Sequence, residues 1–110
     1  MEDFQVINEY LMIRLPAELD HHLAQYFCQK ADEYLLNPCI RHIVFDFERT
    51  SFMDSSGVGM IMGRYRKVNR LGGKIYILHG GNHILRIFRI SGMEKYINVV
   101  KEEKCKEIAE

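Results

Sequence analysis

The feature that most constrains the fold is the alternation of short apolar runs with longer amphipathic stretches. "FQVIN" (4–8) and "LMIRL" (11–15) are rich in β-branched and aliphatic residues, and the polar pair Glu9 and Tyr10 separates them. These runs predict a hairpin or two adjoining strands. Three later runs predict further strands: "IRHIVFDF" (40–47), "KIYIL" (74–78) and "INVV" (97–100). The alternation of strands and helices predicts an α/β fold with a mixed four- to five-stranded sheet and right-handed crossovers.

Between these strands, apolar residues recur at the three- and four-residue spacing of helices. The first helix is predicted to begin after Asp20, as N-cap, and to stop at Asn37-Pro38. The second is predicted to begin around Ser55 to Gly57 and to stop at Gly72-Gly73. A third helix is expected over residues 83–91, and a charged terminal helix over 101–109. The apolar stripes consist of Leu23, Ala24, Phe27, Ala31, Tyr34 and Leu35 in the first helix, and of Val58, Ile61, Met62, Tyr65 and Val68 in the second.

The run at 40–47 alternates, which predicts a central strand. Ile43, Phe45 and Phe47 are expected on one face of that strand, while Val44 and Asp46 are expected on the other, because successive side chains in a strand point to opposite faces.

Composition excludes several classes of protein. A chain of 110 residues with 47% hydrophobic content predicts one domain over residues 1–110. Fifteen basic and fifteen acidic residues give no net charge, which disfavours nucleic acid as a partner. No apolar run approaches the roughly 20 residues of a membrane span, and the N-terminus is acidic and polar. We therefore expect a cytoplasmic protein that does not bind membranes. The three cysteines lack paired spacing and favour reduced thiols.

Ser55 and Ser56 lie where a strand end leads into a helix N-terminus. In open α/β sheets this edge is where ligands and partners bind, and the free amides of a helix start favour an anion. One serine could serve only as the N-cap, worth about 1 kcal/mol. Alternatively, an exposed serine beside an acid, with a glycine following, is a reachable acceptor for a kinase. Dipole and capping arguments do not choose between the two serines.

Enzymatic readings of this stretch fit less well. Gly57, Gly59 and Gly63 resemble a dinucleotide loop, but Met62 stands where glycine or alanine is required, and no acidic residue follows at ribose distance. A nucleophilic serine would need a glycine two residues before it, and neither serine has one. A small serine hydrolase or a nucleotide-binding protein therefore remains only an alternative. Cys39 and His42 fall on opposite faces of a strand, so we expect no metal site there, and no cofactor.

Several ordered stretches resemble a known family. They are "ELDHH" (18–22), "IRHIVFDFE" (40–48), "SFMDSSGVGMIMGRYRKV" (51–68), "GGKIYI" (72–77) and "RIFRISGMEKYI" (86–97). In this order and spacing they resemble the anti-sigma factor antagonists, small STAS-domain proteins of bacterial partner switching, and the "SFMDSSG" core is similar to that of sporulation members. The chain departs from the family at Pro16-Ala17, where a glycine usually precedes the glutamate.

The resemblance implies a regulatory switch and not an enzyme. The unphosphorylated protein would bind an anti-sigma factor that is itself a serine kinase using ATP, and would thereby free a sigma factor for sporulation transcription. Phosphorylation would release it, and a serine phosphatase would reset it. Carried onto this chain, the acceptor is Ser55, next to Asp54, while Ser56 and Gly57 belong to the contact surface. The resemblance also implies that Glu18 and Asp20 form an acidic loop for basic groups on the kinase.

Two further side chains of the second helix are interpreted from their positions alone. Met60 is interpreted as a core methionine; because it lies off the apolar stripe, the alternative is a partner-facing position as an adaptable contact. Arg64 belongs, with Arg66, Lys67 and Arg70, to a basic side of the helix that we expect to be solvated. His21 and His22 are expected in the first turn of the first helix.

Overall fold

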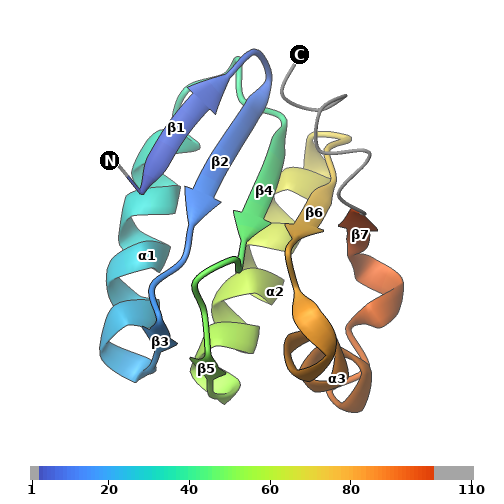
Figure 1. Cartoon of the computed structure of the whole chain (residues 1–110). Coiled ribbons are helices and arrows are strands. Elements are labelled where there is room, and N and C mark those ends of the chain that lie inside the picture. The colour runs from blue at the N-terminus through green and yellow to red at the C-terminus, as the bar shows by residue number, and fades with distance from the viewer. Residues whose placement is uncertain (1–2, 101–110) are drawn as a thin grey trace.

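The computed structural model describes residues 3–100 and contains a five-stranded mixed sheet in the order β1-β2-β4-β6-β7 (Figure 1). Its strands are β1 (Phe4–Ile7), β2 (Tyr10–Arg14), β4 (His42–Asp46), β6 (Ile75–Leu78) and β7 (Asn98–Val100). β1 is antiparallel to β2, and the remaining neighbours are parallel. The predicted mixed α/β sheet is therefore confirmed.

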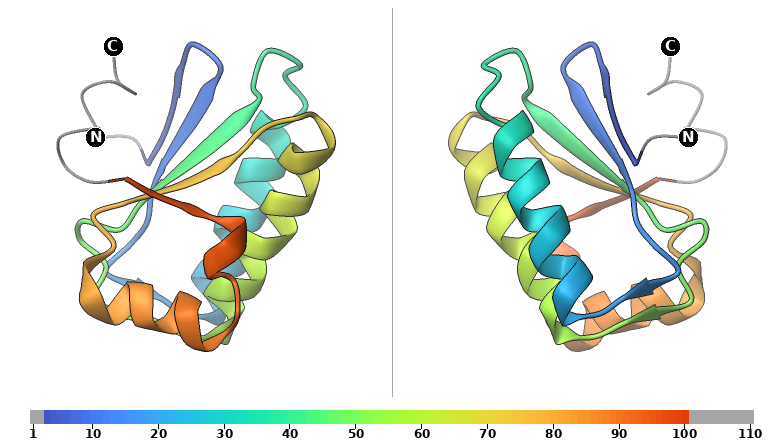
Figure 2. Two further views of the ribbon diagram at one scale, coloured as in Figure 1. Left: turned by 90° about the vertical axis from the view of Figure 1, so that its right-hand side faces the viewer. Right: turned by 90° about the vertical axis from the view of Figure 1, so that its left-hand side faces the viewer.

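The helices are α1 (His21–Tyr34), α2 (Ser55–Arg70) and α3 (Gly81–Ile90), followed by the short 3-10 helix η1 (Glu94–Tyr96). α1 and α2 cover one face of the sheet (Figure 2), while α3 lies beyond the carboxyl ends of the central strands (Figure 1). No helix among the described residues is long and apolar enough to span a membrane. The predicted terminal helix at 101–109 lies outside the described residues.

β1 and β2 form the predicted hairpin, but its turn is one residue earlier than expected. Ile7 pairs with Tyr10, so Tyr10 belongs to β2, and the turn consists of Asn8 and Glu9. Asn8 has a φ of 55°, a left-handed conformation that asparagine tolerates better than most residues.

α1 begins as predicted and ends before the predicted stop. The Asp20 carboxylate accepts a hydrogen bond from the Leu23 amide at 2.9 Å, which satisfies one of the free N–H groups of the first turn. The helix ends at Tyr34, three residues before Asn37, and Asn37 N–H donates to the Tyr34 carbonyl at 3.0 Å in the turn that follows. Pro38 disfavours helical geometry in the residue before it.

The core confirms the predicted alternation in β4. Ile43 and Phe45 are fully buried in the main core, in one cluster with Phe27 of α1 and Ile61 of α2. Val44 is equally buried on the other face, where it belongs to a smaller cluster with Leu78 and Val100.

The predicted glycine stop of α2 is confirmed. The helix ends at Arg70, and Gly72 has a φ of 78°, which glycine adopts without a steric cost. A Cβ atom at Gly73 would lie 1.6 Å from the Arg41 carbonyl oxygen, so only glycine fits there.

Three elements were not predicted. β3 (Glu18–Leu19) and β5 (Phe52–Met53) form a separate two-stranded parallel sheet, and η1 precedes β7.

Candidate functional site

The N-terminus of α2 is placed by the small β3–β5 sheet. Glu18 pairs with Phe52, and Leu19 pairs with Met53. Just before these pairs, the Ser51 amide donates to the Ala17 carbonyl at 2.8 Å. The segment that carries Glu18 therefore lies beside the segment that leads into Ser55, at the carboxyl edge of the main sheet (Figure 1).

Asp54 caps α2. Its backbone is extended, and its carboxylate accepts a hydrogen bond from the Ser56 amide at 2.9 Å. The interpretation of one serine as the N-cap is therefore wrong: Ser55 and Ser56 are the first two helical residues. Because aspartate caps as well as serine does, sequence alone did not separate these possibilities. The Ser55 hydroxyl is left without a capping role.

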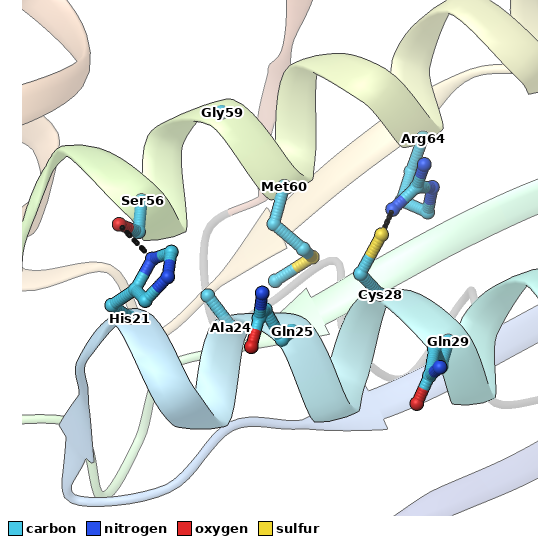
Figure 3. Close-up of a pocket in the computed structure, with 9 residues that line it drawn as sticks. All are labelled: His21, Ala24, Gln25, Cys28, Gln29, Ser56, Gly59, Met60 and Arg64. Carbon is cyan, nitrogen blue, oxygen red and sulfur yellow. Dashed lines mark hydrogen bonds between the residues drawn. The ribbon is translucent and has the colours of Figure 1, made fainter.

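The two serines differ in their surroundings. Ser55 is exposed, and its hydroxyl has no hydrogen bond to any residue in the range 3–100. Ser56 is half-buried, and its Oγ lies 3.1 Å from Nδ1 of His21, in the first turn of α1 (Figure 3). Of the two hydroxyls, only that of Ser55 is both accessible and unengaged.

The Ser56–His21 pair does not extend to a catalytic triad within the described range. A serine nucleophile requires a histidine that a third group orients, usually a carboxylate. No carboxylate of residues 3–100 forms a hydrogen bond or ion pair with His21.

Gly57 was expected on the contact surface, but it is buried. A Cβ atom added there would lie 2.6 Å from Cγ of Met53 and 3.0 Å from Cδ2 of Leu19. Gly57 allows α2 to approach the β3–β5 sheet closely, so it contributes packing and not surface.

A groove of about 560 Å³ runs along the contact between α1 and α2, and the Ser56–His21 pair lies at one end of it (Figure 3). Met60 lines it but is only 5% exposed, so the alternative that Met60 offers an adaptable contact surface is wrong. Arg64 was expected in solvent and is only 7% exposed. α1 packs along this side of α2, so the buried part of α2 is wider than its apolar stripe.

Arg64 is buried, whereas the groups that contact it are partly exposed. Its Nε lies 3.1 Å from Oδ1 of Asp32, and Lys67 contacts the same oxygen at 3.0 Å. Its Nη1 contacts Sγ of Cys28. A buried guanidinium needs such compensation. Arg66 and Arg70 are exposed as predicted.

Three carboxylates give the edge around Ser55 a negative character. Glu18 is exposed, whereas Asp20 and Asp54 are half-buried and use one oxygen each as helix caps. None of the three forms an ion pair within the part of the chain that the structure describes. This edge is therefore suited to a partner that presents basic groups.

Residues 3–105 match the family described as STAS domain, and the chain belongs to this family. It is similar to the anti-sigma F factor antagonist of Paenibacillus polymyxa, with 34% identity over 93 residues that cover 84% of this chain and 80% of the relative. The antagonist of the same name from Lysinibacillus sphaericus is 32% identical over 100 residues, 91% of this chain and 86% of the relative.

Solved structures agree with this assignment. The anti-sigma factor antagonist SpoIIAA in its unphosphorylated form superposes with a TM-score of 0.81 at 33% identity, covering 96% of this chain and 94% of that one. The Bacillus cell fate determinant SpoIIAA in its phosphorylated form gives 0.76, also at 33% identity, covering 97% and 99%. The resemblance to the anti-sigma factor antagonists is thus confirmed.

Proposed function

We propose that this protein is an anti-sigma factor antagonist whose binding is controlled by phosphorylation of Ser55. Unphosphorylated, it binds an anti-sigma factor that is a serine kinase and thereby frees the sigma factor, in keeping with the sporulation role that the "SFMDSSG" core implies. The kinase uses its bound ATP to phosphorylate Ser55 and releases the antagonist, and a serine phosphatase restores it. The exposed, unengaged hydroxyl of Ser55 beside the capping Asp54 carries this proposal.

Electrostatics support release after phosphorylation. A phosphoryl group adds about −1.5 to −2 charges at pH 7, next to Asp54 and on the same edge as Glu18. The added charge and bulk change a surface that otherwise fits the kinase, so binding is lost. The fold is expected to persist, because free amides and the dipole at the N-terminus of α2 stabilise an anion. The switch is then a change of surface and not a refolding.

The decisive experiment compares Ser55→Ala with its matched neighbour Ser56→Ala. Each protein is incubated with the cognate anti-sigma kinase and ATP, and the peptide spanning residues 52–64 is analysed by mass spectrometry. We expect phosphate on wild type and on Ser56→Ala, and none on Ser55→Ala, which should stay bound to the kinase. Normal phosphorylation of Ser55→Ala would contradict the proposal.

A second measurement addresses the hydrolase alternative. A fluorophosphonate probe labels nucleophilic serines without any kinase. We expect no labelling of either serine, because no carboxylate among the described residues orients His21. Labelling of Ser56 that disappears in His21→Ala would favour a hydrolase instead.

A further inference from the structure

A second polar cluster lies at the carboxyl edge, where β4 and β6 end. Asp46, Glu48 and His79 each offer one ligand atom there, and these atoms all lie within 4.8 Å of one another. Oδ1 of Asp46 is 3.0 Å from Nδ1 of His79, and Oε2 of Glu48 is 3.6 Å from the same nitrogen. The proposed switch uses none of these side chains.

The two distances match the spacing of ligands around a zinc ion. Zinc binds histidine nitrogen and carboxylate oxygen at about 2.0–2.2 Å in tetrahedral geometry. Two ligands at the tetrahedral angle are then about 3.3–3.5 Å apart. The observed separations of 3.0 and 3.6 Å lie on either side of this value, and the third separation, between the two carboxylates, is at most 4.8 Å.

The backbone holds the cluster together. Asp46 pairs with Leu78 across the parallel strands, and the Phe47 amide donates to the Leu78 carbonyl at 3.0 Å. His79 follows Leu78 directly and has a φ of 54°. This backbone conformation sets the direction in which its side chain leaves the chain. The Asp46 carboxylate also accepts the Glu48 amide at 2.9 Å. Two of the three groups therefore come from positions set by strand register.

The three side chains differ in their exposure, and this leaves the cluster accessible to an ion from solvent. The Asp46 side chain is 14% exposed and that of His79 is 28% exposed, whereas the Glu48 side chain is 65% exposed and lies at the mouth of the cluster. Asp46 and His79 therefore form the less exposed, partly desolvated side of the cluster. Glu48 forms its solvent-exposed side.

We propose that Asp46, Glu48 and His79 form a Zn²⁺ site with three protein ligands and one open position. An imidazole ligand selects zinc over magnesium or calcium, which prefer oxygen ligands only. Zn²⁺ takes the place of the proton on Nδ1 of His79, and that proton leaves to solvent or moves to Nε2. The bound ion ties the loop after β4 to the loop that leads into α3. It does not depend on phosphorylation of Ser55.

The test uses the full chain and Zn²⁺ alone, with titration calorimetry for affinity and thermal unfolding as a second readout. His79→Asn removes the imidazole, yet asparagine tolerates the left-handed backbone, so the variant should fold. His83→Asn is the matched control, because His83 is close in sequence but outside the cluster. We expect wild type and His83→Asn to bind one ion and to melt at a higher temperature with Zn²⁺ than with chelator.

We expect His79→Asn and Asp46→Asn to bind at least about tenfold more weakly, comparable with or exceeding the loss of a supporting group at known metal sites. Equal affinity in His79→Asn would overturn the proposal, as would no binding by wild type, which would leave the cluster as an ion pair. Replacing Zn²⁺ by Co²⁺ identifies the ligands. Intense thiolate charge-transfer absorption would place the ion on cysteine and overturn the assignment, whereas d–d bands of the intensity typical of tetrahedral Co²⁺, without thiolate charge transfer, support it.

Discussion

At the scale of single residues, Asp54 determines what Ser55 can do. Because the Asp54 carboxylate already accepts the Ser56 amide, the hydroxyl of Ser55 is not needed for the helix. We expect Ser55→Ala to change the free energy of unfolding by less than about 0.5 kcal/mol. Asp54→Ala should cost about 1 kcal/mol. Urea denaturation measures both.

Asp54→Asn is the matched control for this prediction. Asparagine caps as well as aspartate, so this variant should retain nearly all of the stability while losing the charge. If Ser55→Ala were as destabilising as Asp54→Ala, the capping assignment would be incorrect.

Glu18 offers a test of recognition at the same scale. It is exposed in β3 and unpaired among the described residues. If it faces basic groups on the kinase, Glu18→Lys should slow association several-fold at low salt, and the difference should shrink as salt increases. Surface plasmon resonance at several ionic strengths measures this.

Asp20→Asn complements this test, because asparagine keeps the cap of α1 without the charge. Slower association of a stable Asp20→Asn protein would indicate electrostatic contact. Unchanged association rates in both variants at low salt would remove the acidic loop from the interface.

At the scale of elements, the close packing of α2 on the β3–β5 sheet depends on Gly57. A Cβ atom there would meet Met53 and Leu19 at 3.0 Å or less. We expect Gly57→Ala to destabilise the protein by about 1–3 kcal/mol, the range found for overpacking. Gly63→Ala in the same helix is the control, because its Cβ would meet nothing within 4 Å, and it should gain up to about 1 kcal/mol.

Thermal unfolding of the two alanine variants distinguishes packing from helix propensity. Opposite shifts in melting temperature are expected. A stabilising effect of both would mean that Met53 moves aside at no cost.

The elements and contacts of this fold differ in whether a local sequence pattern predicts them. The strands of the main sheet, the N-cap of α1 and the glycine stop of α2 depend on local patterns, and they were predicted. The burial of Arg64 depends on Asp32 and Cys28 in α1, which are distant in sequence, so no local pattern predicts it. β3 and β5 have only two residues each, which is too short for a recognisable alternation. The contact between His79 and Asp46 depends on the register of β4 and β6, and this register cannot be derived from the sequence pattern of either strand.

At the scale of the whole molecule, His42 links stability to pH. Burial lowers its pKa from the ordinary value of 6.5; the charge of Glu9 opposes the shift, and those of Arg41 and Lys74 add to it. Nδ1 also accepts the Lys74 amide at 3.0 Å, which a neutral ring allows. Because the unfolded chain binds this proton more tightly, the free energy of unfolding should be highest above pH 6.5 and should fall as the pH decreases through that value.

His42→Gln removes this titration while keeping an oxygen that can accept the Lys74 amide. Urea denaturation between about pH 8 and about pH 5 should show a shallower loss of stability in the variant than in wild type. Identical pH profiles would show that protonation of His42 does not contribute.

The β3–β5 pairing also has a consequence for design. The Ser51 and Phe52 amides both donate to the Ala17 carbonyl, at 2.8 and 3.2 Å, so the segments at 16–22 and 50–57 form one unit although about thirty positions of chain separate them. An epitope graft that moves the serine-bearing helix start to another scaffold must therefore bring both segments, in register. A peptide copied from either segment alone would present half of the surface, without the backbone that orients it.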